Sequence, residues 1–318
     1  MMDKGMIEGV KLDPNNSSMG QCESCKYSKA TCKPIGKECD LKHCEKLSNE
    51  VHTDLWGPSP VQTPGRKSYY VSFTDDHTPY TCLYLQSAKS ETFESYKTYE
   101  AWLQTQHDTQ VKHLRSDRGG EYLSDEFSQH LKTRGTEQKL TTHDMPQHNR
   151  VAEQLNQTLV KRVRAVLHTS GLLKNLWGEA IKHAVYVKNR TATSALDGKM
   201  PYEMLHSKKP NLMDLPVWVT KVWVHDPSGS KLDPHAWEGR WIGVDAETGA
   251  HRVYFADRRT IAIERNVSFE WNEGVRPPPS LPIERESETT KNNQQTPLST
   301  PNALLPTKPQ PDPLGPNF

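Results

Sequence analysis

Three strand-like runs follow one another between residues 51 and 85, and this order limits the folds that the chain can adopt. Each run is rich in aromatic and β-branched residues, and turn-forming residues separate the runs. Helical and strand patterns then alternate, with helices expected over 90–106, 125–133, 149–168 and from 175 onward, and strands over 111–117 and 137–140. Consecutive antiparallel strands followed by alternating helices and strands predict an α/β fold with a mixed five-stranded sheet flanked by helices.

The character of the sequence changes three times, which predicts four parts, 1–48, 49–212, 213–271 and 272–318. The first part is polar and rich in cysteine, and the second carries the alternating patterns. Short strand-like runs separated by turns predict a small β-rich module for the third part. The last part mixes proline with Ser, Thr, Asn and Gln, and this composition buries too little apolar surface to fold, so we expect a disordered linker.

Three carboxylates stand out because they lie on separate expected elements. Asp54 and Asp117 fall in runs that are typical of buried strands, where a charge is costly without a partner, and Glu153 falls in the first turn of a helix. Acids that converge in this way form a site for two hard divalent cations, Mg²⁺ or Mn²⁺, which suit phosphodiester chemistry. Taken singly, the two aspartates could instead end strands, and the glutamate could stabilise the helix dipole. Together they favour a DNA-processing enzyme.

The region around Glu153 is basic although the whole chain has a formal net charge of only +1. Helical spacing places Asn156, Gln157, Lys161 and Arg164 on the same face as Glu153. Such a face can follow the phosphates of a nucleic acid, although a solvated helix face with no ligand explains the same charges.

Several blocks in order carry a specific resemblance. They are H-T-D-L-W-G-P from His52, L-R-S-D-R-G-G-E-Y from Leu114, M-P-Q-H-N-R-V-A-E-Q-L-N-Q-T-L from Met145, L-W-G-E-A from Leu176 and S-K-L-D-P-H-A-W-E-G-R-W-I-G-V from Ser230. Over roughly residues 6 to 270 the chain thereby resembles the integrase of copia-type LTR retrotransposons, as a fragment of a Gag-Pol polyprotein. The resemblance implies an RNase H-like core whose catalytic Asp, Asp, Glu triad is Asp54, Asp117 and Glu153.

The resemblance also implies a reaction and its partners. The reaction is 3′-end processing of the element's cDNA followed by strand transfer into host DNA, with two Mg²⁺ or Mn²⁺ ions held by the triad. Gln147 and Asn149, in the loop before the long helix, and the helix residues Asn156, Gln157, Lys161 and Arg164 would contact DNA. Family members act as homo-multimers on chromosomal DNA, which implies a protein made in the cytoplasm that works in the nucleus. We expect no membrane span and no secretion signal.

The cysteine-rich first part raises the question of zinc. Cys22 and Cys25 have the two-residue spacing that places two thiolates on one tetrahedral ion. The resembled family completes this site with two upstream histidines, and the first histidine here is His43, so the zinc site looks incomplete. Free thiols are the alternative.

Two departures from the family pattern motivate a second hypothesis. Arg118 follows Asp117 where the family has asparagine, and His148 and Arg150 replace glutamine and glycine before Glu153. Loss of the glycine reduces backbone freedom next to the triad. The alternative is therefore a decayed or co-opted integrase fold that binds nucleic acid without catalysis.

Overall fold

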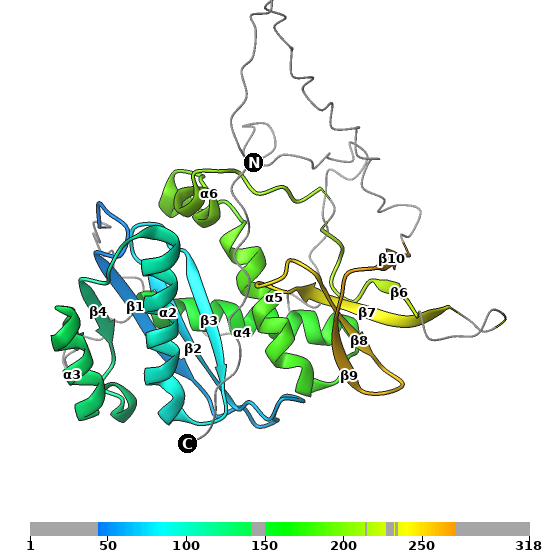
Figure 1. The fold of residues 1–318 in the computed structure, drawn as a ribbon, viewed down its shortest axis with the longest axis horizontal. Helices are drawn as coiled ribbons and strands as arrows, with labels where there is room; N and C mark the ends of the chain where they lie inside the picture. Colours follow the sequence, from blue (N-terminus) through cyan, green and yellow to red (C-terminus); the bar gives the residue numbers. More distant parts are fainter. Residues whose placement is uncertain (1–43, 141–149, 214, 227–231, 233–234, 271–318) are drawn as a thin grey trace, which may run out of the picture. The chain divides into compact units, whose positions relative to one another are not determined.

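The computed structural model describes residues 44–140, 150–213, 215–226, 232 and 235–270 (Figure 1). The cysteine pair of the expected zinc site and the expected disordered linker lie outside these ranges. Within them, no helix has the length and apolar character needed to cross a membrane.

A mixed five-stranded sheet organises residues 44–213 (Figure 1). Its strands are β1 (Glu50–Trp56), β2 (Tyr69–Asp75), β3 (Thr81–Gln86), β4 (His113–Ser116) and β5 (Glu137–Leu140), in the order β3-β2-β1-β4-β5. β1, β2 and β3 are antiparallel neighbours, whereas β4 and β5 run parallel to β1. The predicted mixed sheet is confirmed, and β3 and β5 are its edges.

Helices cover both faces of this sheet. The helices are α2 (Thr92–His107), α3 (Asp125–Arg134), α4 (Arg150–Ser170), α5 (Trp177–Asn189) and α6 (Pro201–His206), with 3-10 turns η2 (Lys89–Glu91), η3 (Gly120–Tyr122), η5 (Lys174–Leu176) and η6 (Ser194–Leu196). Side chains of α2 and α3 share one buried cluster with β1, β2 and β4, while α4 and α5 share another with β2. The α-helix expected from Ser90 begins two residues later, because a 3-10 turn precedes it.

The predicted β-rich module is a second sheet in which all neighbouring strands are antiparallel. It contains β6 (Lys221–His225), β7 (Ala236–Val244), β8 (His251–Phe255), β9 (Thr260–Glu264) and β10 (Val267–Phe269), in the order β10-β6-β7-β8-β9. Trp241 is fully buried at its centre. Ile242 and Tyr254 pack against Leu176, so this sheet also contacts the start of α5.

His183 of α5 lies where this second sheet meets the helix, and it should make stability depend on pH. Its ring lies 5.5 Å from that of Trp241, and burial lowers the pKa of His183 to about 4. The unfolded histidine takes up a proton as the pH falls through about 6.5 and the folded one does not, so acid favours unfolding. We expect the unfolding free energy to fall by about 2 kcal/mol between pH 7.5 and 5.0 through this residue.

Urea unfolding of the wild type and His183→Phe at both pH values measures this effect. Phenylalanine retains the aromatic contact and removes the titration, so the variant should lose less stability in acid. Equal losses in the two proteins would show that His183 titrates normally.

Candidate active site

Asp54 lies on β1 with its side chain directed to the face of the sheet that α4 covers. Residues alternate between the two faces of a strand, so Asp54 shares a face with Glu50 and His52. The carboxyl group is half-buried, and its Oδ2 accepts a hydrogen bond of 2.7 Å from Asn156 Nδ2. This bond fixes one oxygen of Asp54, and the carboxyl group also accepts a hydrogen bond from the backbone of Leu55.

Asn156, in the second turn of α4, is itself held by β2. The hydroxyl of Tyr70 donates to Asn156 Oδ1 at 3.2 Å, which turns the amide nitrogen toward Asp54. Asn156 is 6% exposed and Tyr70 is fully buried. The three side chains therefore form a relay from β2 through α4 to β1, and they attach the helix that carries Glu153 to the strand that carries Asp54.

Asp117 follows the end of β4, one residue beyond the strand, and does not lie within it as the sequence predicted. In the parallel register of β1 and β4, His52 pairs with Arg115. Because both strands run in the same direction, two further residues along each of them place Asp117 beside Asp54. Its Oδ1 accepts a hydrogen bond of 3.0 Å from the backbone N–H of Gly119.

Glu153 occupies the first turn of α4 and is exposed. Because Asn156 lies three residues later, the bond from Asn156 to Asp54 keeps this turn of the helix near β1. The predicted helix position of Glu153 is confirmed.

The electrostatics of Asp54 indicate that both other acids act on it. Burial, with repulsion from Asp117 and Glu153, raises the pKa of Asp54 to about 6, against the opposing effect of the Asn156 hydrogen bond. Within the described ranges, no three His, Cys, Asp or Glu side chains are already gathered as a metal site. The donors nevertheless fit a hard cation, because all are carboxylate oxygens and a bound cation would relieve their repulsion.

The predicted DNA-contacting residues separate into different environments. Gln157 and Arg164 are exposed, and Lys161 is half-buried. Asn156 is buried with its amide engaged, so it positions Asp54 and is closed to a nucleic acid in this structure. Gln147 and Asn149, like Cys22 and Cys25, lie outside the described residues.

Tyr70 is the site residue that the sequence did not single out. The hydrogen bond from Tyr70 to Asn156 depends on the register of β2 on β1, in which Tyr70 lies opposite Trp56. It also depends on how α4 is rotated about its own axis. The only signal was the strand alternation, which places Tyr70 on one face with Ser72.

Removing the amide of Asn156 should destabilise the protein. Asn156→Ala leaves Asp54 and Tyr70 without their shared partner, and hydrogen bonds to charged groups contribute about 2 kcal/mol. Gln157→Ala is the matched control, because it changes an exposed neighbour on the same helix. Urea unfolding should give a clear loss for the first variant and about 0.5 kcal/mol or less for the second. Similar losses would contradict the role assigned to Asn156.

The comparisons with known proteins begin with relatives by sequence. The chain is 31% identical over 225 residues to the retrovirus-related Pol polyprotein from transposon TNT 1-94 of Nicotiana tabacum, covering 70% of this chain and 17% of that protein. It is 26% identical over 265 residues to the corresponding polyprotein from transposon RE1 of Arabidopsis thaliana, covering 82% and 18%. This chain is a homologue of plant retrovirus-related Pol polyproteins. It spans less than a fifth of their length.

A family model and solved structures give further likenesses of this Pol homologue. Residues 220–281 match the retroviral polymerase SH3-like domain, a range that includes all five strands of the second sheet. The simian T-cell lymphotropic virus intasome, solved with PP2A regulatory subunit B56 gamma, is similar with a TM-score of 0.44 at 16% identity, over 79% of this chain and 88% of that one. The HTLV-2 integrase catalytic core domain, solved with magnesium in a trimeric form, gives 0.38 at 16% identity, over 50% and 97%.

Proposed function

We propose that this chain is a retrotransposon integrase that processes the 3′ ends of element cDNA and joins them to host DNA. The observation that carries the proposal is that Asp117, just after β4, and Glu153, on α4, both lie close enough to Asp54 on β1 to raise its pKa. The homology to plant Pol polyproteins supports the same function.

The proposed reaction needs little covalent help from the protein. Two Mg²⁺ or Mn²⁺ ions, when held by the three carboxylates, would activate the attacking oxygen and stabilise the leaving one. Both steps are in-line displacements, first by water and then by the new 3′-OH, so positioning dominates. Asn156 and Tyr70 orient Asp54 for this purpose, while exposed Gln157 and Arg164 are available to DNA on the same helix.

The same proposal extends to assembly and location. Acting on two cDNA ends at one target favours a homo-multimer, and acting on chromosomal DNA requires the nucleus. Size measurement with and without paired DNA ends, and fractionation of expressing cells, test these two points directly.

A second candidate function is DNA binding without catalysis. The observation that favours it is Arg118, an exposed cation directly after the proposed metal ligand Asp117.

Joining of a branched DNA that mimics the strand-transfer product separates the two functions. The full chain should rejoin this DNA in Mg²⁺ or Mn²⁺ and fail in EDTA. Mn²⁺ should also raise the thermal unfolding midpoint of the wild type more than that of Asp54→Asn, a readout that needs no turnover. Salt-sensitive DNA binding with no joining and no Mn²⁺ effect would favour the non-catalytic function.

A further inference from the structure

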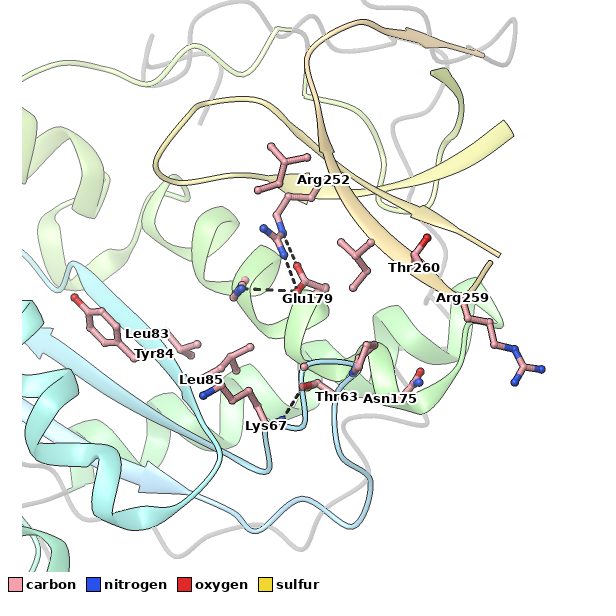
Figure 2. A pocket seen from close by; sticks show the side chains of 15 residues that line it. Thr63, Lys67, Leu83, Tyr84, Leu85, Asn175, Glu179, Arg252, Arg259 and Thr260 are labelled. Carbon is pink, nitrogen blue, oxygen red and sulfur yellow. Dashed lines mark hydrogen bonds and ion pairs between the residues drawn. The ribbon is translucent and has the colours of Figure 1, made fainter. Parts of the chain in front are cut away.

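A groove of about 780 Å³ lies away from the three acids, between the two sheets (Figure 2). β3 lines one side with Leu83, Tyr84 and Leu85, and β9 lines another with Thr260, Ile261 and Ile263. Glu179 and Lys182 of α5 also contribute to its lining. Both β3 and β9 are edge strands, so the groove is bordered by one open edge of each sheet.

The β3 edge presents unused peptide groups to its outer side. The side-chain amide of Asn189 bonds the N–H and the C=O of Thr81 at 3.0 and 2.8 Å, so these groups point away from β2. Antiparallel strands alternate inward and outward peptide groups, so those of Leu83 and Leu85 also point outward. No hydrogen bond from the described part of the chain reaches them.

The β9 edge has the same property. Asp245 N donates a hydrogen bond of 2.8 Å to Ala250 O, so the peptide groups of even-numbered residues in this region point toward β7. The peptide groups of the odd-numbered residues of β8 therefore point the other way and bond β9. The register pairs those residues with the even-numbered residues of β9. Ile261 and Ile263 thus direct their peptide groups away from β8, and among the described residues nothing bonds them. Ile263 is also 48% exposed, which is unusual for an apolar edge residue that has no partner.

The charged lining of the groove is mostly basic. It holds four cations and one acid, which are Lys67, Lys182, Arg252, Arg259 and Glu179. Figure 2 shows Arg252 and Glu179 directed toward each other, while the side chain of Arg259, just before β9, extends outward. Lys67 is paired with Glu91, and Arg252 is paired with both Glu179 and Asp245. With these partners counted, the groove keeps one positive charge in excess, that of Arg259, and this charge favours an acidic ligand.

We propose that this groove binds an acidic partner peptide as an added strand on the β9 edge. Ile261 and Ile263 would exchange backbone hydrogen bonds with the peptide, whose apolar side chains would pack on the aliphatic lining. Its carboxylates, on the alternate face, would meet Arg259 and would compete with Glu91 and Glu179 for Lys67 and Lys182. Ile261 and Ile263 each offer an N–H donor and a C=O acceptor, and a peptide backbone can pair with both. A phosphate chain has acceptors only, so it would leave the two C=O groups without a partner.

A defined probe tests the proposal with the full chain. The probe is a fluorescein-labelled ten-residue peptide of alternating valine and glutamate, followed by anisotropy, with amide hydrogen exchange measured in parallel. We expect saturable binding and slower exchange at Ile261 and Ile263. A block peptide of the same composition and an alternating valine–lysine peptide should bind at least about tenfold more weakly, a difference of about 1.4 kcal/mol.

Variants of one residue separate backbone pairing from simple hydrophobic contact. Ile263→Pro removes an outward N–H that β8 does not use, so it should weaken binding about tenfold, whereas Ile263→Val should not. A peptide N-methylated at alternate residues makes the same test on the unaltered protein, and it too should bind poorly. Equal binding of the N-methylated probe would overturn the proposal. Protection of the two amides by a ten-nucleotide oligothymidylate, and not by the peptide, would also overturn it in favour of a nucleic-acid surface.

Discussion

Asp117→Asn should reduce joining of branched DNA by at least about a thousandfold, because the amide removes a negative charge that the proposed metal site requires. The fold should survive the change. The Oδ1 of Asp117 accepts a hydrogen bond from the backbone N–H of Gly119 at 3.0 Å, and an asparagine oxygen can accept the same bond. Repulsion of Asp54 would also diminish, so the variant should be at least as stable as the wild type without metal.

Asp125→Asn provides the matched control for this variant. Asp125 is an exposed carboxylate in the first turn of α3, so its removal changes the net charge equally without touching the site. Joining rates and urea unfolding should be measured for all three proteins under the same Mg²⁺ concentration. Full activity in Asp117→Asn would remove this residue from the proposed triad, and lost activity with lost folding would require the Asp54→Asn comparison instead.

Local patterns were sufficient to predict the sheet and its helices. The enrichment of aromatic and β-branched residues in β2 and β3, and the helical spacing of Tyr96, Tyr99 and Leu103 in α2, depend only on neighbours in sequence. Element ends were less exact. Asp117 falls beyond β4 because strand pairing with β5 stops at Ser116, and a sequence pattern does not contain that limit.

The relay at the candidate site depended on tertiary pairing. Tyr70 and Asn156 are 86 residues apart, and their bond requires both the register of β2 on β1 and the rotation of α4. Sequence spacing correctly placed Asn156 on the helix with Glu153, but it could not show that Asn156 is buried. The sequence also could not predict that β3 and β9 are edge strands, because strand order in space does not follow strand order in the chain.

Arg252→Met should destabilise the protein by about 3 kcal/mol, because it leaves a buried carboxylate without its partner. Arg252 Nε and Nη2 donate to the two oxygens of Glu179 at 2.6 and 3.0 Å, and Nη1 donates to Asp245 at 3.1 Å. This bidentate pair joins β8 to α5, so its loss should also weaken the contact of the second sheet with the helix. Urea unfolding should show the loss, and the second sheet's amides should exchange faster than those of β1.

Two further variants assign the effect to the ion pair. Lys182→Met removes a cation that lies 3.7 Å from the same Glu179 oxygen but is more exposed, so it should cost about 0.5 kcal/mol or less. Glu179→Gln combined with Arg252→Met should cost less than the sum of the single changes, because the neutral amide no longer needs a cation. Additive losses, or equal losses in Arg252→Met and Lys182→Met, would mean that packing by the arginine side chain holds the second sheet to α5 and that its charge contributes little.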